Sequence, residues 1–186
     1  MKTMLAVVLM AGLATAEEAK LDVKVWVKGM SCPTGCGAKL EKSLAAMPGA
    51  SSAKLVNFEE GLFSVAVDAK TAVKPSEIKK AATGFEVTKI VATIGGTVAK
   101  EKDGYVLTTS AGAKYSLAAA TAEECAKGLK EGEKGECPIG KLDALLGAKT
   151  SAVKVTGAVT ECCEGMLTIT IVKAEGCTAG DAKATN

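Results

Sequence analysis

The chain of 186 residues is long enough for one ordinary domain or two small ones. It has 23 basic and 21 acidic residues and only 3% aromatic residues. Because the lysines are scattered among glutamates, nothing indicates a nucleic-acid-binding surface, and we expect no nucleic-acid partner. The sequence contains no histidine, which excludes histidine-based metal sites, histidine general bases and the usual catalytic triads.

The first 16 residues have the pattern of a secretory signal peptide. Lys2 supplies the positive start, residues 5–13 the apolar core, and residues 14–16 (Ala-Thr-Ala) the small-residue cleavage site. The apolar run is too short to span a membrane, and no cysteine follows it to carry a lipid. We therefore expect a mature protein that is exported, periplasmic or extracellular, without a membrane anchor.

Two cysteines define the chemical centre of the chain. Residues 29–36 (Gly-Met-Ser-Cys-Pro-Thr-Gly-Cys) lie between an alternating apolar run and a run with helical spacing. Cys32 is thus predicted on a strand-to-helix loop and Cys36 in the first helical turn. The unpaired amide groups and the positive dipole at a helix start favour thiolate there. Thiolate is the form that binds a soft metal or attacks a disulfide.

Residues 21–94 carry the pattern strand-helix-strand-strand-helix-strand. Alternating apolar positions predict the strands, and Pro75 and Gly84 mark the start and end of the second helix. This order predicts a ferredoxin-like βαββαβ domain, whose bounds we place at residues 21–95. The predicted strands cover about residues 21–29, 53–58, 63–67 and 85–92, and the predicted helices about residues 36–47 and 75–82.

Residues 21–94 resemble the heavy-metal-associated (HMA) domain of copper chaperones, metal-transporting ATPases and periplasmic mercury-binding proteins. The resemblance rests on residues 29–32 (Gly-Met-Ser-Cys), on Cys36 at the helix start, and on residues 84–85 (Gly-Phe) before the last strand. The chain departs from the family at one point, because three residues separate the cysteines where the family has two.

The resemblance implies that Cys32 and Cys36 bind one soft ion. Copper(I) is the first expectation, and mercury(II), zinc(II) and cadmium(II) are the alternatives. It also implies that Met30 packs under the loop and that Phe85 lies close to the site. The expected partner is a protein that donates or accepts the metal, and the expected state is a monomer.

The second half has a different pattern, which begins after a glycine pair at 95–96 and a charged linker or turn at 100–104. It predicts a small, mainly antiparallel β domain over residues 100–177 with helical inserts, so the whole chain is expected to be α+β. The domain resembles a partly open barrel of the oligonucleotide/oligosaccharide-binding (OB) type. The tail, residues 178–186, is expected to be disordered. Hairpins are predicted at 105–117 and 153–171, a helix at 121–129, and a short apolar turn or helix at 142–146.

Five further cysteines lie in the second half, so seven in total leave at least one thiol without a disulfide partner. One interpretation is structural disulfides, since export permits them. The other is a second thiolate site for metal or redox chemistry. The residues concerned are Cys125, Cys137, Cys162, Cys163 and Cys177.

We therefore expect a soft-metal-binding protein, not an enzyme, that binds and transfers an ion through Cys32 and Cys36. One alternative is a thiol–disulfide redox protein that uses the same two thiols. A second alternative is a structural or interaction protein stapled by disulfides, in which Cys32 and Cys36 are permanently bonded.

Overall fold

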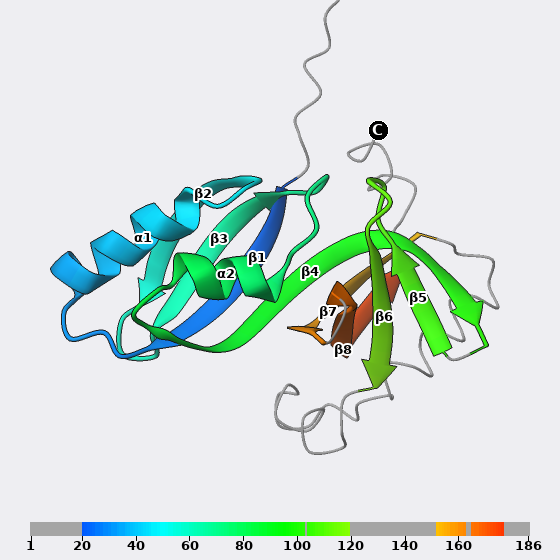
Figure 1. Ribbon diagram of the computed structural model, residues 1–186. Coiled ribbons are helices and arrows are strands. Elements are labelled where there is room, and N and C mark those ends of the chain that lie inside the picture. The colour runs from blue at the N-terminus through cyan, green and yellow to red at the C-terminus, as the bar shows by residue number, and fades with distance from the viewer. Residues whose placement is uncertain (1–19, 103, 120–151, 163–164, 177–186) are drawn as a thin grey trace, which may run out of the picture.

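The computed structural model describes residues 20–102, 104–119, 152–162 and 165–176 (Figure 1). Their eight strands form one continuous sheet, to which two helices are added, so the fold is α+β and dominated by strands. Neither helix is long and apolar enough to cross a membrane, within the part of the chain described.

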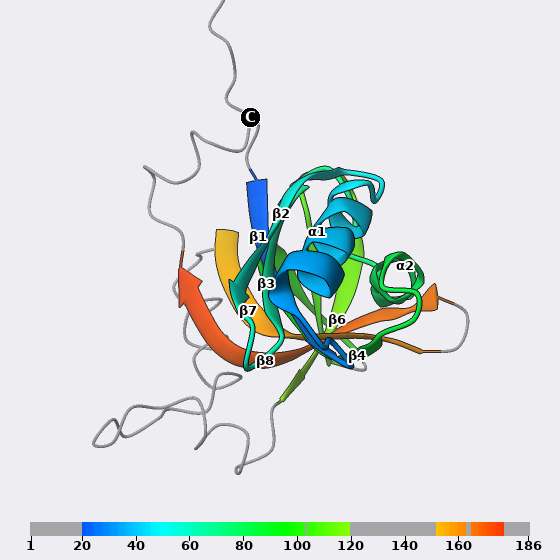
Figure 2. The same ribbon diagram turned by 90° about the vertical axis from the view of Figure 1, so that its left-hand side faces the viewer.

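The first part of the chain has the element order strand-helix-strand-strand-helix-strand. Its strands lie in the order β2-β3-β1-β4, and every neighbouring pair is antiparallel. Both helices lie on the same side of this sheet (Figure 2). The elements are β1 (Lys20–Lys28), α1 (Ala38–Ala45), β2 (Ala50–Asn57), β3 (Leu62–Asp68), α2 (Pro75–Ala81) and β4 (Glu86–Glu101).

The alternating apolar and polar residues of the sequence lie on the two opposite faces of the sheet. In β1, Val23 and Val25 are fully buried beneath the helices, while the residues between them point away. In α1, Leu40 and Leu44 are spaced by four residues and are both buried against the sheet. Burial of these apolar faces fixes the helices on the sheet.

Strand β4 is longer than the sequence predicted. The expected strand at 85–92 is corrected, because β4 continues through the glycine pair to Glu101. Of the two expectations for residues 100–104, the turn is confirmed, because β4 ends at Glu101, which pairs with Gly104 at the start of the next strand. Gly96 has a local reason for being glycine: a Cβ there would lie 2.5 Å from the carbonyl oxygen of Thr108. The missing side chain lets neighbouring strands approach closely, so the glycine that suggested a break instead permits continuity.

The second part is a closed ring of five strands, which Figure 1 shows beside the helix-covered sheet. The order around the ring is β4-β5-β6-β8-β7 and back to β4, and only β6 and β8 are parallel. Since β4 belongs to both parts, the boundary between the predicted domains 21–95 and 100–177 falls at a continuous strand; the two-domain division itself stays a prediction. The further strands are β5 (Gly104–Thr108), β6 (Lys114–Ala119), β7 (Ala152–Glu161) and β8 (Leu167–Gly176).

Hydrogen bonds also join the two parts away from β4. The hydroxyl of Tyr115, a residue 1% exposed, accepts the backbone N–H of Val73 at 2.8 Å. At the start of α2, the backbone N–H of Ser76 donates to the carboxylate of Glu161 at 2.9 Å. The side chain and amide of Ser76 hold the pKa of Glu161 below its usual value, so the carboxylate stays charged at this helix end.

Replacing Tyr115 with phenylalanine tests the first of these bonds. Tyr115→Phe keeps the ring but leaves the buried N–H of Val73 without an acceptor, so the free energy of unfolding should fall by about 1–3 kcal/mol. Urea unfolding measures the change, and Ser116→Ala on the exposed face of the same strand is the control. A Tyr115→Phe protein as stable as the parent would contradict the assignment.

Candidate functional site

The site lies on the loop that leads from β1 into α1. Gly29 begins the loop with φ +93°, a conformation that favours glycine. Cys32 is extended, and residues 33–37 then form a single π-helical turn with Pro33 at its first position. The N–H of Gly37 closes the turn by donating to the carbonyl oxygen of Cys32 at 3.2 Å. The helical backbone thus begins at Pro33 and continues into α1 at Ala38, and Cys36 lies in its first turn, as predicted from the sequence.

Helix α1 holds this loop in place from the other side. Its buried leucines anchor it to the sheet, and the carboxylate of Glu41 accepts the backbone N–H of Leu55 on β2 at 2.7 Å. Gly37 packs so closely that a Cβ there would lie 3.0 Å from the side chain of Leu55. The turn that carries the cysteines therefore packs directly against β2.

The sulfurs of Cys32 and Cys36 lie 3.9 Å apart, and both residues are half-buried. Both are free thiols, since a disulfide would bring the sulfurs to about 2.05 Å. The permanently bonded pair expected in the disulfide-stapled alternative is thus not formed in this structure. The two sulfurs face each other as a dithiol.

Ser31 is the site residue that the sequence analysis missed. Its hydroxyl lies 3.4 Å from the sulfur of Cys36. Hydrogen bonds from the Ser31 side chain, then from its amide, and from Cys32 lower the pKa of Cys36 from 9.0 to about 7. A hydrogen bond to the charged form favours that form, so about half of Cys36 is thiolate near pH 7. The signal for Ser31 was its place before a helix start, where a hydroxyl often bonds to local groups.

Gly35 leaves space for the sulfur of Cys32. A Cβ at this position would lie 2.9 Å from the sulfur of Cys32, closer than unstrained contacts allow. The absence of a side chain at Gly35 therefore lets the Cys32 sulfur lie against the turn.

The two predicted support residues lie on the rim of the core. Met30 and Phe85 are half-buried and pack against the core cluster, which is consistent with supporting roles. Their action on the loop stays a prediction.

Of the five C-terminal cysteines, the structure describes Cys162, an exposed free thiol at the turn between β7 and β8. Its sulfur donates weakly to the carbonyl oxygen of Met166 at 3.7 Å. Cys125, Cys137, Cys163 and Cys177 lie outside the described residues, as do residues 1–16, 121–129, 142–146 and 178–186. The expectations for these stay predictions.

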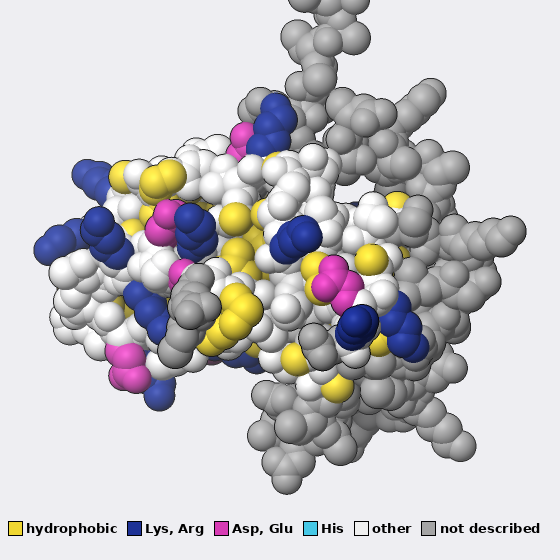
Figure 3. Space-filling view, turned by 45° about the vertical axis from the view of Figure 1, so that its right-hand side comes forward, with side chains coloured by type: hydrophobic (Ala, Val, Ile, Leu, Met, Phe, Trp, Pro, Cys, Tyr) yellow, Lys and Arg dark blue, Asp and Glu magenta, His cyan; other side chains and the backbone are white. Residues whose placement is uncertain are grey.

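Among the described residues, no group of three or more His, Cys, Asp or Glu side chains could hold a metal ion. The Cys32–Cys36 pair therefore offers an ion two sulfur ligands there. Lysines and a few carboxylates are interspersed over the face in Figure 3, without one extended charged patch.

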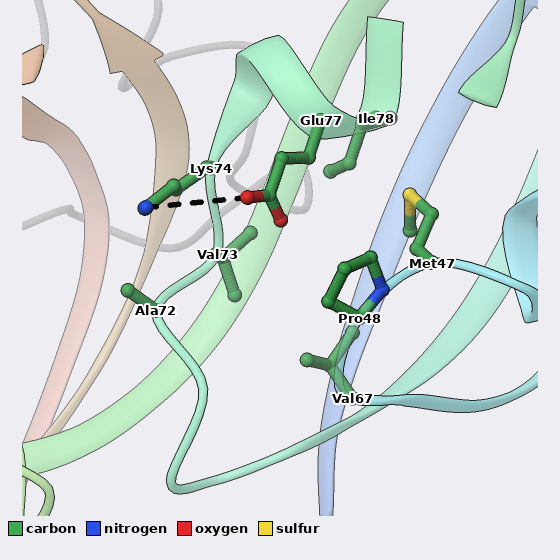
Figure 4. A pocket seen from close by; sticks show the side chains of 8 residues that line it. All are labelled: Met47, Pro48, Val67, Ala72, Val73, Lys74, Glu77 and Ile78. Carbon is green, nitrogen blue, oxygen red and sulfur yellow. Dashed lines mark ion pairs between the residues drawn. The ribbon is translucent and has the colours of Figure 1, made fainter. Parts of the chain in front are cut away.

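A shallow apolar pocket lies at the other end of α1, away from the thiols (Figure 4). Met47 and Pro48 form one wall, and the ion pair of Lys74 with Glu77, at 4.0 Å, lies across from them. Its lining is otherwise aliphatic, so it offers an ion no soft ligand other than the Met47 thioether. The pocket is completed by Val67, Ala72, Val73 and Ile78.

No protein-family model matches the chain, and no curated protein matches it. Among solved structures, it is similar to the water-soluble region of the P-type ATPase CopA from Bacillus subtilis. The identity is 17%, the TM-score is 0.35, and the match covers 83% of this chain and 76% of that one. A TM-score of this size does not establish a shared fold, so the HMA resemblance stays a prediction from the sequence.

The pKa of Cys36 predicts how it reacts. Alkylation by iodoacetamide, followed for the Cys36 peptide by mass spectrometry, should rise with pH with a midpoint near 7, because the thiolate is the reactive form. Ser31→Ala should move that midpoint upward, towards 9.0, while Thr34→Ala in the same turn should leave it in place. A parent midpoint above 8.5 would contradict the role given to Ser31.

Proposed function

We propose that this chain is an exported protein that binds one soft metal ion through Cys32 and Cys36 and passes it to a partner protein. The observation that carries the proposal is the pair of free, facing sulfurs 3.9 Å apart on an exposed loop. The strand order β2-β3-β1-β4 with both helices on one side supports a ferredoxin-like domain of the HMA kind for this part.

The spacing of the sulfurs suits chelation. With a metal–sulfur bond of about 2.3 Å, two thiolates on one ion lie roughly 3.8 Å apart at a tetrahedral angle and 4.6 Å apart when linear. The observed separation falls within that range. Two thiolates without a nitrogen or oxygen ligand select soft ions, with copper(I) first and mercury(II), cadmium(II) or zinc(II) as alternatives.

Transfer of the ion to a partner is proposed because two sulfur ligands would leave part of the ion accessible from solvent. Both cysteines remain partly exposed, and the residues of the turn between them are exposed. An incoming ligand from a partner can therefore bond to the ion before either sulfur leaves. Ligand exchange of this kind needs no catalytic group, so we assign binding and delivery and no enzymatic reaction.

A second candidate function uses the same residues. A dithiol in contact at 3.9 Å, with one pKa near 7, is also suited to cycling between dithiol and disulfide. That reaction would release two electrons and two protons to an oxidant when the disulfide forms. The two functions differ in whether the pair holds an ion while it remains reduced.

We infer that the second part is a barrel of the OB type that serves as a docking or scaffold module. The inference is supported by the five-stranded ring and by the parallel pairing of its third and fifth strands, β6 and β8. Its hydrogen bonds to the α2 region would hold the metal-binding part in a fixed orientation for a partner.

Native mass spectrometry tests the proposal on the mature chain, kept reduced and free of oxygen and offered copper(I). We expect one ion per chain in the parent and none at this site in Cys32→Ser/Cys36→Ser. Cys162→Ser, which removes an exposed thiol elsewhere, is the matched control and should bind as the parent does. Equal binding by the parent and the double variant would refute the assignment.

A further inference from the structure

We propose that the face of the helix-covered sheet that points away from α1 and α2 is a docking surface for an acidic protein. We call it the outer sheet face. None of its residues belongs to the cysteine loop, so the inference does not depend on the proposed binding of a metal. Its side chains come from the four neighbouring strands β2, β3, β1 and β4: Lys54, Leu62, Lys24, Trp26, Lys89 and Val91.

No described element covers the outer sheet face. Both helices lie on the other side of the sheet (Figure 2), and the alternation of each strand turns every second side chain away from them. Lys54 and Lys89 are exposed, and 43% of the Lys24 side chain is accessible. The face is therefore available for contact with a partner.

Trp26 lies at the centre of this face. In the register of the strands it is opposite Leu62 on β3 and Lys89 on β4, and Val91 is its diagonal neighbour. All three apolar side chains are partly exposed. Tryptophan is enriched among the residues that contribute most to binding at protein interfaces, where it lies in an apolar centre surrounded by a polar rim. The outer sheet face has this arrangement.

Carboxylates offset some of the lysines on this side of the sheet. Lys24 forms an ion pair with Asp22 at 3.4 Å, and Asp22 also accepts a hydrogen bond from the hydroxyl of Ser64. At the end of β1, Lys28 lies opposite Glu86 of β4. These lysines and carboxylates are matched in number, so together they add no net charge to the face.

Lys54 and Lys89 are the lysines whose charge is not offset. Within the described part of the chain, neither forms an ion pair. The ammonium of Lys89 lies 5.4 Å from the centre of the Trp26 ring, and Lys54 lies on the far side of β3 from that ring. Positive charge therefore flanks the apolar centre on both sides. A protein surface with carboxylates around an apolar patch complements it.

Other occupants fit this face less well. A second copy of the chain, stacked face to face, would bring two positive surfaces together. Single-stranded nucleic acid binds to successive aromatic side chains, whereas Trp26 is the one tryptophan of the chain and Lys89 lies over its ring. A membrane interface favours aromatic rings that reach the headgroups, whereas Trp26 is partly buried within a strand.

Tryptophan fluorescence tests the proposal on the mature chain, because Trp26 is the only tryptophan. The probe is a synthetic acidic peptide in which glutamates flank leucines. We expect the peptide to shift the emission of Trp26 and to bind more weakly as salt is raised. An unchanged emission spectrum would overturn the proposal. Tighter binding to phosphatidylglycerol vesicles or to oligothymidylate would also overturn it and would identify a membrane or a nucleic acid as the occupant.

A matched pair of lysine variants locates the charged contacts. Lys54→Gln/Lys89→Gln should weaken binding of the fluorescein-labelled peptide at least about fivefold, measured by anisotropy. Lys79→Gln/Lys80→Gln removes the same charge from exposed positions of α2, on the other side of the sheet, and should bind as the parent does. Equal weakening in both variants would show that the peptide responds only to the overall charge of the chain, which would contradict the docking surface.

Two further variants separate this surface from the cysteine site. Trp26→Ala should weaken binding of the labelled peptide about 30-fold, the effect of truncating a central interface residue. Cys32→Ser/Cys36→Ser should bind the peptide as the parent does. Circular dichroism shows whether each variant is folded. A folded Trp26→Ala protein that binds as tightly as the parent would overturn the proposal, and so would loss of binding in the cysteine variant, which would place the peptide at the loop.

Discussion

The structure depends on the hydrogen bonding of one strand, β4, along both of its edges. One edge pairs with β1 and then with β5, while the other pairs with β7. The helix-covered sheet and the five-stranded ring are therefore built on the same strand and share a continuous core. Because β1 leads directly into the cysteine loop, the position of the thiols is fixed to the same framework. Among the described residues, the five-stranded ring is linked to the helix-covered sheet through this strand and through the hydrogen bonds of Val73 and Ser76.

Much of the first part could be predicted from the sequence, because its signals are local. Alternating valines gave β1, and Pro75 gave the start of α2. The extent of β4 could not be predicted, because a glycine such as Gly96 occurs both where a strand ends and where two strands approach closely. The position of the Thr108 carbonyl on the neighbouring strand shows that Gly96 is of the second kind, and this position is not visible in the sequence. The pairing of strands distant in sequence, such as β6 with β8, likewise could not be predicted from the residues of either strand.

At the site, too, the positions of residues along the chain could be predicted, but distances that depend on the folded loop could not. The sequence placed Cys32 and Cys36 on a strand-to-helix loop, and both are there. It did not give the separation of their sulfurs, which depends on the turn formed by the three residues between them. It also missed Ser31, whose effect on Cys36 arises from the fold of the loop and not from residue type alone. The three residues between the cysteines lie in a π-helical turn, which places the two sulfurs 3.9 Å apart.

The proposed function requires Cys32 and Cys36 to act as a reduced chelating pair. The most direct measurement is differential alkylation of these two residues in the mature protein, with and without bound copper(I), read by mass spectrometry of the Cys32–Cys36 peptide. We expect both thiols to be labelled in the metal-free protein, copper(I) to protect both, and a chelator to restore labelling. A peptide that labels only after reduction, whether or not copper is present, would show a permanent disulfide and contradict the claim.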